Sequence, residues 1–229
     1  YASSNIPLTA KSSITASDPG LRSLITDQVV QDTGMMSSVA VNQMIEALRN
    51  YNDVQTLGLI TSATNTSNSS GVNLTLALWT AAKAAFKAQK PLGTLCFVGS
   101  TNQMRDFDLD LINSGGGTMV QGAGLDIFNG AMVDGYRGIY NGVAIFESAN
   151  VPEFDASNDS GAFFVLQPGA GPDGVTLSPF AMGVWQEITA EGVRVPSRKG
   201  DDVTVTERVG WQVWAQYWLR EFVTKKAAA

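Results

Sequence analysis

The chain has 229 residues, enough for one large domain or two closely joined lobes with a sizeable buried core. Its net charge is −6 and its pI about 4.6, which argues against a nucleic-acid-binding protein with a basic stripe. Histidine is absent, so a Ser-His-Asp or Cys-His catalytic site is excluded. Charged residues make up only 16% of the chain. This low fraction favours lasting contact with other chains, and a monomer with a neutral surface is the alternative.

The single cysteine, Cys96, lies in the apolar run 95–98. An apolar setting raises a thiol pKa, so we expect a buried structural thiol and not a nucleophile. No apolar run reaches the length of a membrane span, and no signal peptide is evident. Because the chain begins at Tyr1 instead of methionine, we expect that an N-terminal piece is missing.

The N-terminal part predicts an extended arm followed by two helices. Residues 1–16 are polar and β-prone, which is typical of an arm that packs on neighbours or frays. Asp18 and Pro19 form a helix start. Apolar residues then follow helical spacing at Leu21, Leu24, Ile25 and Val29. After Gly34, a longer helix is predicted over about 35–52. Its apolar face holds Val41, Met44, Ile45, Leu48 and Tyr51.

The next part predicts two more helices around a buried strand. Residues 61–71 are a polar, low-complexity segment, read as a surface loop or as a domain boundary. Asn73 is the expected cap of a helix over 74–89. Residues 94–98 predict a buried strand, and Thr101 opens a helix that ends at the glycines 115–117. The inward residues of these two helices are predicted to be Leu76, Trp79, Ala82, Phe86, Met104, Phe107, Leu111 and Ile112.

From residue 118 onward, turn signals and apolar strands dominate. The turn pairs are Asn129-Gly130, Asp134-Gly135, Asn141-Gly142 and Asp173-Gly174. Residues 138–146 read as a hairpin with a type I′ turn, mostly buried and leaving through Pro152. A strand at 162–166 and a loop at 168–174 follow. Long strands are then expected at 183–195 and 202–223, joined by 196–200.

The last segment is ambiguous between helix and strand. A helical stripe would contain Trp211, Trp214 and Trp218, whereas a strand would alternate through Val209, Trp211, Val213, Ala215 and Tyr217. Its β-branched and aromatic residues favour the strand. Together with Trp185, these rings form an aromatic-rich end, in which we expect some rings to face the core and others to meet neighbouring chains.

Several groups of residues resemble phosphate-binding or cation-binding motifs, but their sequence context argues against these functions. The glycines at 115–117 and 122–124 lack the markers of a phosphate-binding loop. Asp106, Asp108 and Asp110 alternate as in a calcium loop, but the segment predicts a helix with a solvated acidic face. Asp201-Asp202 reads as a charged turn in preference to a cation site. No catalytic, cofactor-binding or metal-binding residue is therefore assigned, and no cofactor is expected.

Two further sets of charged residues each have two possible interpretations. Glu147, Glu153, Asp155 and Asp159 could supply paired carboxylates for glycoside hydrolysis, if two of them lay at the required separation. The cations Arg194, Arg198 and Lys199, beside Asp201 and Asp202, could form ion pairs between subunits. The alternative for them is a solvated loop that contributes little to stability.

The order of these elements resembles the major capsid proteins of tailed double-stranded DNA bacteriophages, the Hong Kong 97-type fold. Residues 45–48 lead into Asp53–Gly58, similar to the family's long helix and Leu-Gly turn. Residues 142–152 resemble its hairpin strand that ends near Ser-x-x-Val-Pro, and residues 208–211 resemble its Arg-x-Gly pattern. Residues 1–16 are too short for the family's projecting arm-loop and scaffolding segment. The resemblance therefore implies a processed or truncated chain.

The resemblance implies an α+β capsid fold with a long spine helix, an axial lobe and a peripheral lobe. Residues 1–57 would form the arm and spine helix, 58–175 the axial lobe, and 176–229 the C-terminal strands of the peripheral lobe. The implied protein is not an enzyme. It self-assembles into hexamers and pentamers of an icosahedral virion shell, built in the cytoplasm of a bacterial host.

The shell implied by the resemblance would enclose DNA without sequence-specific binding and without a membrane. Portal, scaffold or decoration proteins would be further partners. Three alternatives stay open: an encapsulin-like compartment, a soluble carbohydrate-active enzyme, and a non-capsid surface or tail component.

Overall fold

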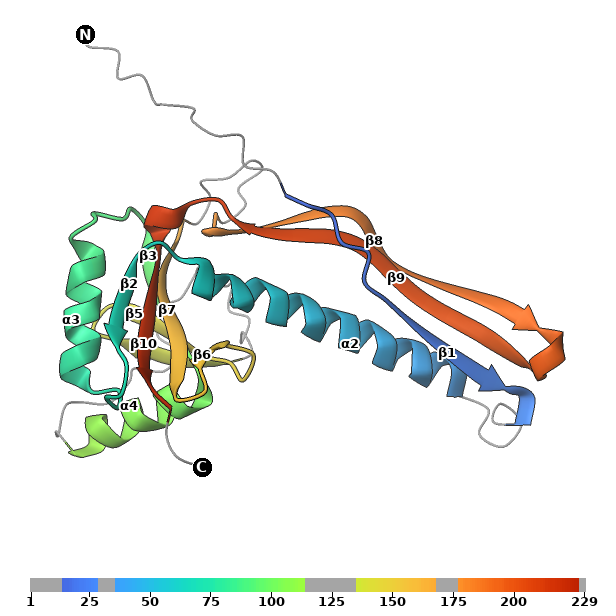
Figure 1. Cartoon of the computed structure of the whole chain (residues 1–229), viewed down its shortest axis with the longest axis horizontal. Coiled ribbons are helices and arrows are strands. Elements are labelled where there is room, and N and C mark those ends of the chain that lie inside the picture. Colours follow the sequence, from blue (N-terminus) through green and yellow to red (C-terminus); the bar gives the residue numbers. More distant parts are fainter. Residues whose placement is uncertain (1–13, 29–35, 114–134, 168–176, 227–229) are drawn as a thin grey trace, which may run out of the picture. The chain divides into compact units, whose positions relative to one another are not determined.

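The computed structural model describes residues 14–28, 36–113, 135–167 and 177–226 (Figure 1). Its internal contacts divide the chain into two compact units. Unit 1 holds Tyr1–Leu48 and Met182–Trp214, and unit 2 holds Arg49–Ala181 and Ala215–Ala229. Each unit has a β-sheet of its own, and helices accompany the sheets. This mixed content confirms the predicted α+β class.

Unit 1 is built on a three-stranded sheet in the order β1-β9-β8 (Figure 1). Strand β1 (Gly20–Thr26) pairs antiparallel with β9 (Gly200–Val213), and β8 (Phe180–Val195) lies along the other side of β9. The short 3-10 helix η4 (Pro196–Arg198) joins β8 to β9. The predicted strand at 183–195 and its connection at 196–200 are thereby confirmed.

The helix predicted after Asp18-Pro19 is wrong, because strand β1 occupies this segment. Gly20 faces Thr206 and each following residue faces its partner on β9, down to Thr26 opposite Gly200. Residues with helical spacing therefore fall on alternating faces of a strand: Ile25 is buried, whereas Leu24 is 37% exposed. Pairing with a long neighbouring strand overrides the local helix signal.

Helix α2 (Met36–Gly58) confirms the longer predicted helix and extends it by six residues beyond Asn52. Its first part belongs to unit 1, where it packs against the sheet. The buried cluster there consists of Ile25, Met44, Leu48, Val203 and Val205, with Ala40, Val41, Ile45 and Ile188 partly buried around it. Tyr51, predicted on the apolar face, is exposed. The 3-10 helix η1 (Leu59–Ser62) follows the helix.

Unit 2 contains a seven-stranded mixed sheet, in the order β2-β10-β7-β3-β5-β4, with β6 paired to β7. The strands are β2 (Thr66–Ser69), β3 (Thr94–Gly99), β4 (Tyr136–Tyr140), β5 (Val143–Glu147), β6 (Glu153–Asp155), β7 (Asn158–Leu166) and β10 (Leu219–Lys225). Helices α3 (Leu76–Lys87) and α4 (Thr101–Asn113) belong to the same unit.

An aromatic-rich core lies between the sheet and the helices of unit 2. Trp79 of α3 meets Phe163, Phe107 and Tyr140, with ring centroids 5.4 to 5.6 Å apart. The buried members of this cluster are Leu74, Trp79, Ala82, Phe86, Leu95, Phe97, Met104, Phe107, Val143, Ile145, Phe163, Val165, Ala215, Trp218 and Phe222. The predicted strands at 94–98 and 162–166 form its centre.

Some predictions for the first half of unit 2 are corrected by the structure. The polar segment 61–71, read as a loop, contains β2, which pairs parallel with β10. The cap of α3 is Thr75 and not Asn73, because the Thr75 side chain accepts a hydrogen bond from the Leu78 amide. On α4, Met104 and Phe107 are buried as predicted, whereas Leu111 is only partly buried and Ile112 is 76% exposed.

The single long strand predicted at 202–223 is two strands in two different units. Strand β9 ends at Val213, the 3-10 helix η5 (Gln216–Trp218) follows, and β10 begins at Leu219. Trp218 and Phe222 are buried in the unit 2 core, so this part of the chain belongs to the sheet of unit 2 and does not continue β9. The strand predicted for the ambiguous segment is confirmed for Val209–Val213. It is wrong for residues 215–217, which lead into and form part of η5.

The division into axial and peripheral lobes stays a prediction. The boundaries between the two units follow residues 48, 181 and 214. The boundaries between the predicted lobes follow residues 57 and 175. Unit 2 also contains β10, as an interior strand of its sheet between β2 and β7, although the prediction assigns all of residues 176–229 to the peripheral lobe. Several predicted segments lie outside the described residues: residues 1–13 of the arm predicted at 1–16, the glycine clusters at 115–117 and 122–124, the turns at 129–130 and 173–174, and the loop at 168–174.

Candidate assembly surfaces

The sheet of unit 1 exposes a long edge strand. Strand β8 is 16 residues long, lies at one side of β9, and has no buried residue along its length. Its exposed apolar side chains include Met182, Val184, Trp185 and Val193, each about half or more exposed. Natural proteins usually shorten, charge or cover such an edge, because its free backbone groups pair readily with another chain.

The segment before β1 continues the antiparallel pairing of β1 along β9. Ser17 and Val209 exchange two backbone hydrogen bonds, of 2.7 and 3.0 Å. A Cβ on Gly210 would lie 2.3 Å from the carbonyl oxygen of Thr15, so only glycine admits this close pairing. This explains the glycine of the Arg208–Trp211 pattern in physical terms.

The predicted charged cluster forms ion pairs within the chain. Arg194 of β8 donates to Asp27 over 2.6 Å and to Asp201 over 3.3 Å, and Arg22 of β1 donates to both oxygens of Asp202 over 2.8 Å. The Arg194 hydrogen bond lowers the pKa of Asp27, and the Arg22 hydrogen bond lowers that of Asp202. These arginines therefore tie β1, β8 and β9 together, instead of requiring partners on another subunit.

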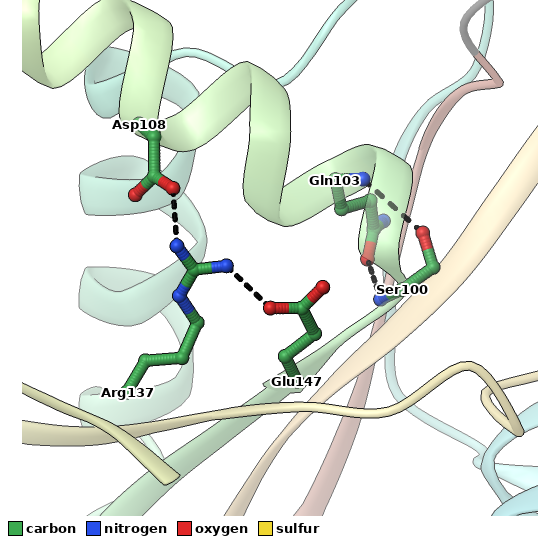
Figure 2. Close-up of polar contacts among 5 residues, drawn as sticks. All are labelled: Ser100, Gln103, Asp108, Arg137 and Glu147. Carbon is green, nitrogen blue, oxygen red and sulfur yellow. Dashed lines mark hydrogen bonds and ion pairs between the residues drawn. The ribbon is translucent and has the colours of Figure 1, made fainter. Parts of the chain in front are cut away.

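A capping box fixes the start of helix α4 in unit 2 (Figure 2). The Gln103 amide donates to Ser100 Oγ over 3.2 Å, and the Ser100 amide donates to Gln103 Oε1 over 3.3 Å. Ser-x-x-Gln is a recognised sequence signal for this arrangement. The helix begins at Thr101, as predicted, whereas the Ser100 cap in front of it was not predicted.

The same glutamine connects α4 to the middle of the sheet. Gln103 Nε2 donates to Thr224 Oγ1 over 2.8 Å and to the Phe222 carbonyl over 3.2 Å, both on β10. It also lies 3.4 Å from the Asp159 carbonyl of β7. Gln103 is 1% exposed, so it is a buried polar hub with its hydrogen-bonding capacity used.

A second polar contact joins α4 to the hairpin (Figure 2). Arg137 of β4 donates to Asp108 of α4 over 2.5 Å and also to Glu147 of β5. The guanidinium bridges two carboxylates through separate nitrogens, and each of these hydrogen bonds is charge-assisted. No sequence signal identified Arg137 in advance, because its partners lie on elements distant in the chain.

The acidic residues considered for calcium binding or hydrolysis have structural roles. Asp110 accepts a hydrogen bond of 2.7 Å from the Leu76 amide, and Asp106 is buried, so the solvated acidic face predicted for α4 is wrong at these positions. Burial raises the pKa of Asp106, reinforced by Asp159 and opposed by Arg105. The described residues contain no group of three or more potential ligands arranged to hold a metal ion.

The candidate carboxylates of β6 and β7 are likewise engaged. Glu153 pairs with Lys226, and Asp155 accepts hydrogen bonds of 2.7 and 2.9 Å from Ser157 and Asn158. Asp159 is buried and accepts a 2.9 Å bond from Ser100 Oγ. Each of these three candidate carboxylates therefore holds a structural contact within the chain.

The hairpin that was predicted from Asn-Gly is present. Strands β4 and β5 are joined by Asn141 at φ 49° and Gly142 at φ 72°, the two positive values that a type I′ turn requires. Gly138, Val143, Ala144, Ile145 and Val151 are buried, and the turn itself is exposed. Lys83 of α3, itself buried, donates to the Asn141 carbonyl and lies 5.6 Å from the Trp79 ring centroid.

The aromatic-rich end divides between core and surface. Trp218 is buried in unit 2 and Trp211 is partly buried in unit 1. Trp185, Trp214 and Tyr217 are 44 to 57% exposed. The core role is therefore confirmed for Trp218, whereas contact of the exposed rings with neighbouring chains stays a prediction.

Cys96 is buried, as the sequence predicts. The Cys96 side chain is fully buried in β3, and burial raises its pKa to about 12. Such a thiol is not a nucleophile at neutral pH. Among the described helices, none combines the length and the apolar character that a membrane crossing requires.

Neither a scan of protein-family models nor a search of curated proteins finds a match. Solved structures do match. One from Mycobacterium phage Che8 has a TM-score of 0.63 at 16% identity, over 90% of this chain and 70% of that one. The acidic stable capsid of Helicobacter pylori bacteriophage KHP30 gives 0.62 at 12% identity, over 93% and 74%.

An encapsulin has a similar structure. The holo-SrpI encapsulin complex from Synechococcus elongatus PCC 7942 gives a TM-score of 0.57 at 11% identity, over 91% of this chain and 73% of that one. At such low identities the likeness concerns the fold. The chain therefore has the fold of phage capsid and encapsulin shell proteins, the Hong Kong 97-type fold that its sequence resembles.

Proposed function

We propose that this chain is the major capsid protein of a tailed bacteriophage, which assembles into hexamers and pentamers of an icosahedral shell around double-stranded DNA. The observation that carries this proposal is the likeness to phage capsid structures over nine-tenths of the chain. In this proposal α2 is the spine helix, unit 1 belongs to the peripheral lobe and most of unit 2 to the axial lobe. The protein resides in the virion and is assembled in the host cytoplasm.

The surfaces of unit 1 support a role in assembly. A 16-residue edge strand without a buried residue is costly to leave open in a soluble monomer. Its exposed apolar side chains include Val193 and Trp185, and tryptophan is among the residues enriched at the energetic centres of interfaces. Contacts of this kind, repeated by symmetry, can close a container. Portal, scaffold or decoration proteins would join the shell through surfaces that the proposal does not assign.

Electron microscopy of the purified protein, combined with light scattering, tests the proposal. Closed shells of uniform diameter are expected, and a strictly monomeric protein at high concentration would contradict it. Val193→Lys, which places a charge on exposed β8, is expected to abolish shells while the circular dichroism spectrum is retained. Val193→Thr is the matched control, because it keeps the β-branched shape without the charge, and it is expected to assemble.

An encapsulin-like compartment is the second candidate, since the encapsulin structure matches over a similar share of the chain. Particles purified from the native source discriminate the two. Nuclease-protected DNA inside the shell supports the phage capsid, whereas an enclosed protein cargo without DNA supports the compartment. Filaments or open rings would favour a non-capsid surface or tail component. The carbohydrate-active enzyme is not proposed further, because its candidate carboxylates hold structural contacts.

A further inference from the structure

A buried carboxyl group on α4 has an oxygen without a hydrogen-bond partner. Asp106 lies one turn after Gln103 on the buried side of the helix and is 7% exposed. Its Oδ2 atom is buried and has no hydrogen-bond partner among the described residues. Its Oδ1 atom lies 3.7 Å from a guanidinium nitrogen of Arg105, whose side chain is largely exposed. Because an ionised oxygen without a donor is costly to bury, this position favours the neutral carboxyl group.

A second buried carboxylate acts on the same group. Asp159 of β7 is 3% exposed. Burial raises the pKa of Asp106, Arg105 lowers it, and the negative charge of Asp159 raises it further. Two neighbouring carboxylates in a buried site resist ionising together, so they bind a proton as a pair.

The surroundings decide which member of the pair keeps the negative charge. Asp159 Oδ2 accepts a 2.9 Å hydrogen bond from Ser100 Oγ, at the cap of α4. Lys226, which follows β10 and pairs with Glu153 of β6, also interacts electrostatically with Asp159. A donated hydrogen bond and a nearby cation both stabilise an ionised carboxylate. The Oδ2 atom of Asp106 has no such donor, so the proton of the pair resides on Asp106.

We propose that Asp106 and Asp159 form a proton-dependent contact between α4 and β7. With a proton on Asp106, the site holds a single negative charge, and the buried side of α4 packs against β7. Without that proton, two negative charges lie in the same buried site, and their repulsion weakens the packing of the helix on the strand. Mild acid therefore strengthens this contact within unit 2.

The pH dependence of this contact is opposite in sign to that of the arginine–aspartate pairs of unit 1. The pKa of Asp106 is raised, so its stabilising contribution is complete below the ordinary carboxylate range and is lost as the pH rises through the raised pKa. The pKa values of Asp27 and Asp202 are lowered by Arg194 and Arg22, so their contribution is lost as the pH falls. Of these three carboxylates, Asp106 alone stabilises the fold more as the pH falls.

Infrared spectroscopy of protein isotopically labelled at the aspartate carboxyl carbon tests the proposal on free subunits and on assembled shells alike. The label separates aspartates from glutamates, and a protonated carboxyl group absorbs apart from a carboxylate. We expect a protonated aspartate band that persists above the ordinary aspartate pKa of about 4 and disappears as the pH rises further. Asp106→Asn should abolish this band. Asp159→Asn keeps an oxygen for Ser100 and should shift the disappearance of the band to lower pH.

Urea unfolding of the free subunit at different pH values measures the energetic consequence. Relative to Asp106→Asn, which does not titrate, the unfolding constant of wild type should rise between acidic and neutral pH, by roughly tenfold for each unit by which folding raises the pKa. The same comparison in the Asp159→Asn background should give a smaller rise. Asp110→Asn, one turn further along α4, is the matched control: it keeps an oxygen for the Leu76 amide and should not reproduce the effect.

Three results would overturn the proposal. The first is a folded wild type whose aspartates all ionise within the ordinary range. The second is a high-pH band that survives Asp106→Asn, because the proton then resides on another aspartate. The third is a band whose disappearance Asp159→Asn leaves at the same pH, because burial alone then accounts for the proton. The wild-type and Asp159→Asn spectra decide the matter even where Asp106→Asn does not fold.

Discussion

Replacing Gln103 by methionine isolates the polar hub of unit 2. Methionine keeps the length and most of the volume of the side chain, so the core packing is largely retained. The substitution removes the acceptor of the Ser100 amide and the donor to Thr224 and to the Phe222 carbonyl. Each buried group left without its partner costs about 1 kcal/mol or more. The free energy of unfolding of unit 2 should fall by about 3 kcal/mol.

Thermal unfolding followed by circular dichroism measures this loss. For a protein of this size, each kcal/mol corresponds to about 2–4 °C, so the melting temperature should fall by about 6–12 °C. Thr101→Ala is the control, because Thr101 is the first residue of the same helix, two positions before Gln103, and is exposed. It should change the melting temperature by no more than about 2 °C.

A third variant separates the two functions of the glutamine. Gln103→Glu keeps the oxygen that accepts from the Ser100 amide, but loses the donor and adds a charge near Asp159, whose carbonyl lies 3.4 Å from Nε2. Its stability relative to wild type should rise as the pH falls, because protonation of the buried carboxylate removes the charge and restores a donor. A loss below about 1 kcal/mol in Gln103→Met would refute the hub, since the hydrogen bonds would then contribute no more than ordinary exposed ones.

Three further predictions concern other parts of the molecule. Gly210→Ala should lower the melting temperature, because its Cβ would lie 2.3 Å from a backbone oxygen. Gly192→Ala is the control, because its Cβ has no neighbour within 4 Å, and it should not lower the melting temperature. Equal melting temperatures of the two variants would contradict the close pairing of Gly210 with the segment before β1. The pKa of Asp202 is lowered by Arg22, so this pair stabilises the fold above the ordinary carboxylate range and the stability is lost as the pH falls through the lowered pKa. Melting curves against pH should show a larger loss of stability at low pH in wild type than in Arg22→Met, in which the other carboxylates with lowered pKa remain. Native Cys96, with a pKa of about 12 and no exposure, should resist a thiol reagent that labels it at once in urea.

The local signals in the sequence predicted elements whose stability is local. The Asn-Gly turn, with its two positive φ values, was identified from two residues, because few other sequences tolerate that geometry. The strand at Thr94–Gly99 and the helix at Thr101–Asn113 were likewise visible from apolar runs and helical spacing. The Ser-x-x-Gln signal at the start of the latter helix was available in the sequence and was not used.

The errors fall where the partner of a segment lies far away in the sequence. β1 has helical spacing, but it pairs with β9, about 180 residues later. β2 is polar throughout and becomes a strand because β10 lies beside it. The break between Val213 and Leu219 depends on which unit buries Trp218, and no local pattern encodes this.

The assembly surface could be predicted as a class but not as residues. Low charge and an aromatic-rich end indicated contact with other chains, but the rings divide between the core, as for Trp218, and the surface, as for Trp185. A strand shows whether one of its edges is open only when its neighbours in the sheet are known. For β8, the order β1-β9-β8 supplies that information.

The contrast between the two units ties assembly to stability. The core of unit 2 contains tilted and edge-to-face aromatic rings and a buried hydrogen-bonded hub. The buried cluster of unit 1 consists of a few apolar, non-aromatic residues between α2 and its sheet. A three-stranded sheet covered on one side gains little free energy to offset the ordering of its long strands. Any partner that pairs with β8 supplies the missing burial and hydrogen bonds. Unit 1 should therefore be more stable in the shell than in the free subunit, because assembly and the ordering of this sheet stabilise each other.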